Sequence, residues 1–365
     1  MMLNEEQQKI GVITASLGNW AMALAYYGNK LNIPVTVVLP VFTLSSIVEK
    51  CQYYEATVIL NGDSLAESKH RAFTLLAETG KTYLNSYDHP HAIAGAGTIG
   101  LEILEQLPQT DAILIPVGGG GLIAGIATYV KHFKPDVLIY GIEPDKCCSF
   151  FKAIENERPY KTAVSHSLAE SLAVPTVGVN AFHTAQSLIN KMVLVDEDWI
   201  TRAILHLLEN ENFIVEGAGA VSMSALLAVP DILPELREKN VVCLITGGNI
   251  DVVTLPKSLE RAKAVEGRLI KLTVTLPLNG MKEQSKILSI IANVGCNILR
   301  SYIDRGWTDN DFYTIYLTLE IETKGLEHAC ILKRVLERLF PRKCDFIEEP
   351  FSPIPTCSCF PKKFG

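Results

Sequence analysis

Four consecutive glycines, Gly118 to Gly121, stand in the middle of the apolar stretch "AILIPVGGGGLIAGIATYVK", residues 112–131. The pattern before them is typical of a buried strand, and the pattern after them is typical of a helix. Glycines at such a junction leave backbone N–H groups unobstructed, and the start of the helix adds a partial positive charge. A tight turn alone would need one or two glycines. We therefore predict a phosphate-binding loop.

The same segment also fits a dinucleotide pattern, which remains open as an alternative. Residues 119–124, "GGGLIA", match G-x-G-x-x-G/A, and Glu143 ends the next predicted strand, where an acid could bind a ribose hydroxyl. Against a dinucleotide, three strand–helix units precede the motif. A second formal match, "GAGTIG" at 95–100, has no strand before it, so we predict a closely packed helix there.

Two further turns follow predicted strands. "TASLGNWA" places Ser16, Gly18 and Asn19 after the strand 11–15. "LITGGNID" places Thr246 at the end of another strand. Because the carboxyl ends of parallel strands lie on one side of a sheet, where ligands of open α/β folds bind, these turns should lie close together. They suit a flat heteroaromatic cofactor with a phosphate at one edge.

The elements that must hold these turns form an α/β pattern. Nearly continuous apolar runs, from "GVITAS" at 11–16 to "LIYGIE" at 138–143, alternate with helical patterns. Such runs predict parallel strands buried on both faces of a sheet. A charged helical segment at 255–267 is the expected connection to a second domain.

From residue 268 the pattern changes. We predict strands at 269–275, 297–304, 311–321 and 344–348, with helices at 281–293 and 325–339. This order is βαββαβ, as in a ferredoxin-like unit. The expected domains are therefore 1–265 and 268–348, and the Pro-containing tail at 349–365 is predicted to be disordered.

Composition excludes several classes of function. The chain has 365 residues, a formal net charge of -7 and 48% hydrophobic residues. An acidic chain without a basic stripe argues against nucleic-acid binding, and no apolar run is long enough to cross a membrane. Nine cysteines without regular spacing indicate reduced thiols, so we expect a soluble cytoplasmic protein.

Seven motifs add a family resemblance. In chain order they are "ASLGN", "YDHPH", "GTIGLEILEQ", "PVGGGGLIAGIA", "LAVP", "VEGAGA" and "TGGNID". From about residue 3 to 265 the chain closely resembles the pyridoxal-phosphate-dependent L-threonine/L-serine dehydratases (ammonia-lyases) and the related serine racemases, which share the tryptophan-synthase-β-like fold (fold type II). Residues 268–348 resemble the amino-acid-binding regulatory module called ACT.

The resemblance implies a role for each candidate residue. Gly118 to Gly121 would hold the phosphate of pyridoxal 5'-phosphate (PLP), Asn19 would bond the ring hydroxyl, and Thr246 would face the pyridine nitrogen. Ser16, Gly18 and Glu216 are candidates for support of the site. The implied reaction deaminates threonine to 2-oxobutanoate and serine to pyruvate.

The sequence also departs from the family pattern. Family members carry a Schiff-base lysine in a Ser-Phe-Lys-x-Arg-Gly-like motif upstream of the asparagine turn, and this sequence contains no such motif. Trp20 follows Asn19 where relatives have histidine, and "LAESLAVP" has Glu170 and Ser171 where "LADGLAVP" is usual. No catalytic residue is therefore assigned. We expect the chain to be inactive on its own, and an inactive paralogue that binds PLP or an amino acid, or acts as an oligomer partner, is the alternative function.

Metal and effector sites are weaker expectations. Some relatives bind a divalent cation with a glutamate and an aspartate six residues later, but here Glu143 is followed by Ser149, so a metal site is doubtful. In the ACT-like part, Asn279 and Gly280 occupy the turn where an amino-acid effector would bind. The resemblance also implies a homo-oligomer.

Overall fold

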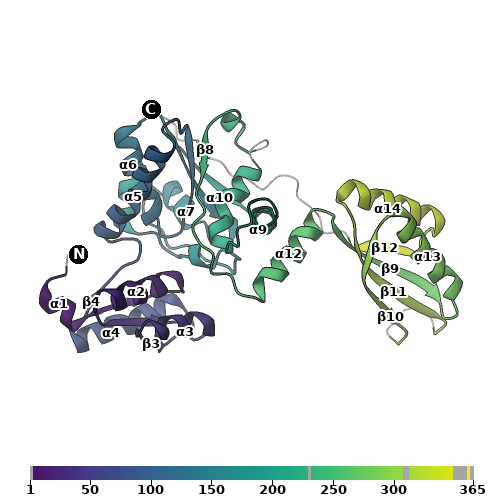
Figure 1. Ribbon diagram of the computed structural model, residues 1–365, viewed down its shortest axis with the longest axis horizontal. Coiled ribbons are helices and arrows are strands. Elements are labelled where there is room, and N and C mark those ends of the chain that lie inside the picture. The colour runs from purple at the N-terminus through teal and green to yellow at the C-terminus, as the bar shows by residue number, and fades with distance from the viewer. Residues whose placement is uncertain (1–2, 229–231, 307–311, 348–359, 362–365) are drawn as a thin grey trace. The chain divides into compact units, whose positions relative to one another are not determined.

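The computed structural model describes residues 3–228, 232–306, 312–347 and 360–361 (Figure 1). The chain forms two compact units, of which the first consists mainly of Met1–Glu197 and Val215–Asn249. The second consists mainly of Asp198–Ile214 and Ile250–Ile354. The domain boundaries expected from the sequence stay predictions.

The first unit begins with a small parallel sheet in the order β3-β2-β1-β4. Every residue of β1 (Val12–Ala15) and β2 (Val35–Leu39) is buried, as their continuous apolar runs predict. The outer strands are β3 (Thr57–Leu60) and β4 (Thr82–Tyr83). The accompanying helices are α1 (Glu5–Ile10), α2 (Asn19–Lys30), α3 (Ser45–Tyr53) and α4 (Leu65–Thr79).

A second sheet of the first unit has the order β13-β7-β6-β5-β8. Its parallel strands are β5 (Ala112–Pro116), β6 (Leu138–Pro144), β7 (Lys191–Val195) and β8 (Val241–Cys243). From the tail that was predicted to be disordered, the structure describes β13 (Phe360–Pro361), which pairs antiparallel with β7. The other residues of that prediction lie outside the described residues.

Helices α5 (Pro90–Gln106) and α6 (Gly121–Phe133) pack closely in the first unit. A Cβ on Gly97 would lie 3.2 Å from the carbonyl oxygen of Gly125, and a Cβ on Gly125 would lie 2.2 Å from that of Ile93. This contact confirms that "GAGTIG" belongs to a closely packed helix. The remaining helices of this unit are α7 (Ser149–Glu155), α8 (Val179–Ala185) and α10 (Gly217–Leu227).

The second unit contains the predicted βαββαβ order. Its antiparallel sheet, β10-β11-β9-β12, comprises β9 (Leu269–Pro277), β10 (Asn297–Asp304), β11 (Thr314–Glu322) and β12 (Cys344–Ile347). Alternate residues of β9 and β11 are buried, and they pack against α13 (Met281–Val294) and α14 (Leu326–Leu339). This confirms the expected ferredoxin-like arrangement.

Two more helices complete the second unit. They are α9 (Glu197–Glu211), of which all but the first residue belongs to this unit, and α12 (Thr254–Val265), which leads into β9. Among the helices of the described part of the chain, none combines the length and the apolar character needed to cross a bilayer.

Candidate active site

The four glycines lie where the sequence placed them, between β5 and α6. Gly120 is the N-cap of α6 and has a left-handed φ of 92°, and no side chain caps this helix. The first N–H groups of a helix have no partner within the helix, so those of α6 remain to be satisfied by something else. The loop therefore offers the donors that a phosphate requires.

Tyr87 covers this loop and explains why glycine is needed there. A Cβ on Gly119 would lie 2.3 Å from Cγ of Tyr87, and a Cβ on Gly121 would lie 2.3 Å from its carbonyl oxygen. Burial raises the pKa of the Tyr87 hydroxyl, with a smaller contribution from Asp88. Packing against Tyr87 therefore requires glycine at positions 119 and 121, while the phosphate assignment depends on the N–H groups at the start of α6.

Glu216, 9% exposed, organises the polar part of the site. Its Oε1 accepts hydrogen bonds from Asn19 Nδ2 at 2.7 Å and from Ser171 Oγ at 3.1 Å. Its Oε2 accepts one from the backbone N–H of Asn249 at 3.1 Å. Asn249 Nδ2 in turn donates to Asn19 Oδ1 at 2.6 Å. Both ends of the Asn19 carboxamide are therefore fixed.

This polar network is adjacent to the glycine loop. Ser171 lies in the 3₁₀ helix η2 (Glu170–Leu172). A Cβ on Gly118 would lie 3.0 Å from Cα of Leu172, the next residue. The loop that should hold the phosphate and the asparagine that should meet the ring hydroxyl thus lie on either side of η2. This arrangement suits a small flat ligand that spans both.

The other residues of the asparagine turn have structural roles. Ser16 is buried, and its Oγ accepts hydrogen bonds from Gly18 N at 3.1 Å and Ala21 N at 3.3 Å, which secures the start of α2. Gly18 is the N-cap of that helix, with a φ of 157°. Trp20 donates from Nε1 to Thr14 Oγ1 at 3.0 Å. Trp20 therefore bonds to a strand of the small sheet and supplies no polar group to the Glu216 network.

Thr246 lies beyond the strand it was expected to end. β8 stops at Cys243, although Leu244 N still donates to Leu114 O at 3.1 Å. Thr246 is exposed. The next residue, Gly247, accepts a hydrogen bond from Glu216 N at 3.1 Å, so this loop is held against the start of α10. Thr246 is thus one residue from the polar network, and its role toward a pyridine nitrogen stays a prediction.

Glu143 is held by backbone groups, and the ribose and cation roles suggested for it stay predictions. It is completely buried, and its two carboxylate oxygens accept hydrogen bonds from Phe150 N and Phe151 N, both at 2.8 Å. The Glu143 carboxyl group therefore binds the first turn of α7 through both of its oxygens. Within the described residues, no cluster of three His, Cys, Asp or Glu side chains could hold a metal ion.

The proposed effector turn contains no comparable network. Gly280 is the N-cap of α13 and donates its N–H to Pro277 O at 2.7 Å, and Asn279 O accepts from Met281 N at 2.9 Å. The Asn279 side chain is exposed. These bonds describe an ordinary strand-to-helix turn, and effector binding there stays a prediction.

Two side chains at the site were not predicted. Asn249 belongs to the motif "TGGNID" and Lys50 lies on an exposed part of α3, and the sequence assigns a role to neither residue. Lys50 Nζ donates to Asn249 Oδ1 at 3.3 Å, so a primary amine meets the same network. Ser171 was noted as a departure from the family pattern, but its bond to Glu216 could not be foreseen.

Comparison with known families supports the sequence resemblance. The family described as "Pyridoxal-phosphate dependent enzyme" matches residues 1–247. The L-threonine ammonia-lyase of Thermotoga maritima is 33% identical over 334 residues, which cover 92% of this chain and 82% of that protein. The L-threonine ammonia-lyase of Geobacter sulfurreducens is 38% identical over 321 residues, which cover 87% of this chain and 78% of that protein.

Solved structures show the same likeness. The processed form of threonine deaminase isoform 2 from Solanum lycopersicum has a TM-score of 0.68 and 35% sequence identity, covering 72% of this chain and 76% of that one. The serine racemase of maize has a TM-score of 0.66 and 28% identity, covering 70% of this chain and 78% of that one.

Proposed function

The chain belongs to the family of pyridoxal-phosphate dependent enzymes, and we propose that it is an ammonia-lyase that deaminates L-threonine to 2-oxobutanoate and L-serine to pyruvate. The structural neighbours confirm the expected tryptophan-synthase-β-like fold. The relatives named above cover most of this chain and are lyases of threonine. They lend no support to the inactive alternative.

One observation carries the assignment to this site. Glu216 fixes the Asn19 carboxamide, and η2 connects that network to the glycine loop through Leu172 and Gly118. The chain thus presents anion donors at one end and an oriented carboxamide at the other. PLP has matching groups, a phosphate and a ring hydroxyl.

In this proposal the residues of this chain bind PLP and orient its ring. The N–H groups at the start of α6 would hold the phosphate, and the helix dipole favours its charge. Asn19 would position the ring through its hydroxyl. When bound, PLP supplies the electron sink for the pair left at the substrate Cα. Thr246 beside the ring nitrogen would leave that nitrogen without a carboxylate partner, which favours loss of the β-hydroxyl over transamination.

The test is the release of ammonia and 2-oxo acid from L-threonine and L-serine by the purified chain with added PLP. The missing lysine motif predicts no turnover, whereas the family assignment predicts turnover; on the family assignment we expect turnover that the Gly119→Asp variant lacks, because a carboxylate in the loop repels the phosphate. Turnover without PLP, or equal turnover by this variant, would contradict the proposal. PLP binding without release of ammonia would instead favour the inactive alternative raised by the departures at the lysine motif.

Finer properties follow as part of the same proposal. The C-terminal βαββαβ sheet would act as an ACT-like regulatory module, and the protein would be a homo-oligomer. A cytoplasmic location is supported by the cysteines, since the seven in the described residues are free thiols. Size-exclusion chromatography with light scattering would report the assembly state.

A further inference from the structure

Lys50, on α3, brings a primary amine to the polar network of the candidate active site. Its Nζ donates to Asn249 Oδ1 at 3.3 Å, and Asn249 Nδ2 donates to Asn19 Oδ1 at 2.6 Å. Two hydrogen bonds therefore connect the amine to the carboxamide that would bind the ring hydroxyl of PLP. Lys50 is flanked by Glu49 and Cys51, so it does not belong to a Ser-Phe-Lys-x-Arg-Gly-like motif, and the family resemblance gives it no role.

The packing of α3 against the asparagine turn fixes the position of Lys50. A Cβ on Gly18 would lie 3.0 Å from Cδ1 of Ile47, so α3 lies directly against the residue before Asn19. Residues three apart share one face of a helix, which places Lys50 one turn beyond Ile47 on the same side. The next residue, Cys51, is completely buried in the core of the small sheet. The backbone is therefore held, while the exposed Lys50 side chain can still turn toward a ligand.

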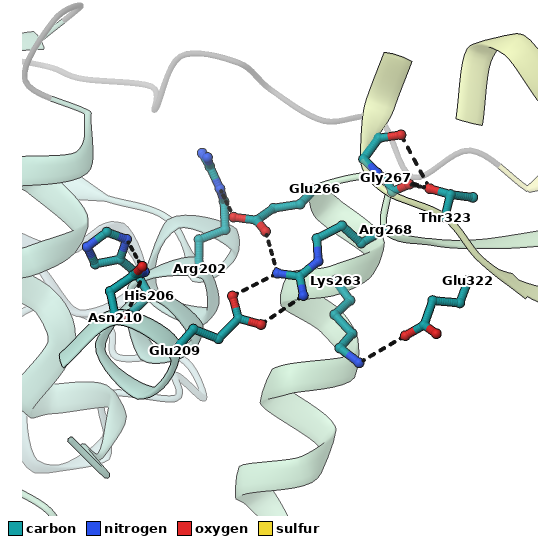
Figure 2. Close-up of polar contacts among 11 residues, drawn as sticks. Arg202, His206, Glu209, Asn210, Lys263, Glu266, Gly267, Arg268, Glu322 and Thr323 are labelled. Atoms are coloured by element: carbon teal, nitrogen blue, oxygen red, sulfur yellow. Dashed lines mark hydrogen bonds and ion pairs between the residues drawn. The ribbon is translucent and has the colours of Figure 1, made fainter. Parts of the chain in front are cut away.

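The hydrogen-bond partner of Lys50 distinguishes it from the lysines that form ion pairs. Lys191 pairs with Glu235 at 3.2 Å in the first unit, and Lys263 pairs with Glu322 at 3.5 Å in the second (Figure 2). Lys50 bonds a neutral carboxamide instead, and in the described part of the chain no carboxylate pairs with it. Loss of a proton from Lys50 therefore breaks no ion pair. This matters because only the neutral amine is a nucleophile.

Lys81 is the competing amine of the small sheet, since burial lowers the pKa of its ammonium group. It donates to Thr36 Oγ1 near the start of β2 and directly precedes β4. Strands β1, β2 and β4 are parallel, and the asparagine turn follows the end of β1. Lys81 thus lies at the opposite edge of this sheet from Asn19. Lys50 is the amine on the side of the candidate site.

We propose that Lys50 is the residue of this chain that attaches PLP covalently. The proposal rests on the proposed function, because it takes PLP as the cofactor of this site. Lys50, as the neutral amine, adds through Nζ to the aldehyde carbon, which is next to the ring hydroxyl on PLP. The aldehyde oxygen leaves as water, and a carbon–nitrogen double bond remains, so the step needs no oxidant or reductant. Asn249 is the positioning residue that holds the amine beside Asn19.

Trapping with sodium borohydride tests the proposal without reference to turnover. The full chain is mixed with equimolar PLP, and hydride from the borohydride reduces the double bond to a stable secondary amine. Mass spectrometry then locates the phosphopyridoxyl group. We expect Lys50 to carry at least about tenfold more of it than Lys30. Lys30 is an exposed lysine at the other end of α2, about 16 Å from Asn19 along the helix axis.

The preference for Lys50 should depend on the phosphate loop. Gly119→Asp should abolish the label at Lys50 and leave the label at Lys30 unchanged. Pyridoxal, which lacks the phosphate, should label the two lysines of the parent chain alike. An equal preference for Lys50 with pyridoxal would mean that it reacts merely as an accessible surface amine, and would overturn the proposal.

Substitutions separate attachment from positioning. Lys50→Arg keeps a charged donor but cannot form the double bond, so both Lys50→Arg and Lys50→Ala should raise the Kd for PLP about tenfold in a fluorescence titration. Lys30→Arg is the matched control and should bind like the parent. Parent-like binding by Lys50→Arg, or binding by the parent without a label at Lys50, would refute this proposal and leave the cofactor site intact. Absence of saturable PLP binding by the parent would contradict the proposed function as well.

Discussion

Glu216 is the residue on which the geometry of the candidate active site depends most. It accepts hydrogen bonds from Asn19, Ser171 and Asn249. Glu216→Gln keeps the size but replaces one acceptor oxygen by a donor, so at least one partner is lost. Because a hydrogen bond to a charged group contributes roughly 1.5–3 kcal/mol, we expect the Kd for PLP to rise about tenfold or more.

The measurement is a titration with PLP followed by cofactor fluorescence. Glu105→Gln, on an exposed face of α5, is the matched control and should bind PLP like the parent. A Glu216→Gln variant whose Kd lies within about twofold of the parent value would show that Asn19 is not oriented through this carboxylate.

A second residue-scale prediction concerns Glu143 and pH. Burial raises the pKa of its carboxyl from 4.5 to about 8, although the bonds from Phe150 and Phe151 act in the opposite direction. Between these two values the folded chain binds more protons than the unfolded chain. This group's contribution to the free energy of unfolding is therefore present at low pH and is lost as pH rises toward 8.

Glu143→Gln cannot titrate, so the variant should lose less stability than the parent between about pH 5 and pH 8. Urea denaturation at both pH values, with Glu105→Gln as the control, measures this difference. A constant gap in stability between parent and variant at the two pH values would mean that Glu143 is ionised throughout.

At the scale of elements, the loop between β5 and α6 is the most constrained connection of the site. A methyl group on Gly119 would meet the Tyr87 ring at 2.3 Å, whereas one on Gly95, in α5, would meet nothing within 4 Å. Gly119→Ala should therefore displace Tyr87 and weaken PLP binding, while Gly95→Ala should leave binding unchanged and favour the helix slightly. PLP titration and thermal unfolding of both variants provide the comparison. Equal PLP affinities would contradict the assigned phosphate loop.

The whole molecule has separate hydrophobic cores in its two units. Ile113 is buried in the core of the larger sheet, and Leu317 in the core of the antiparallel sheet. We expect calorimetry to resolve two unfolding transitions. Ile113→Ala should lower one and Leu317→Ala the other, each by roughly 2–5 kcal/mol of unfolding free energy. A single transition shifted by both variants would show that the units unfold together.

The alternation of strands and helices, the βαββαβ order and the glycine loop could all be predicted from the sequence. Each depends on a local property: the run of apolar residues in β1 and β2, the change of period after residue 268, and the lack of a side chain at Gly118 to Gly121. The hydrogen-bond partners of Glu143 could not be predicted, because a carboxyl group at a strand end can bind a ligand or a neighbouring helix equally well.

The sequence by itself determined which segments could bind a phosphate and a ring, since backbone freedom and side-chain chemistry are properties of single residues. Only the tertiary structure decided which groups meet. Asn19 and Asn249 share a hydrogen bond although 230 positions separate them, and Ser171 reaches Glu216 from a third segment. The physical reason is that the packing of distant elements brings such partners together and fixes their distances to tenths of an ångström. Sequence patterns, in contrast, specify only the element on which each residue lies.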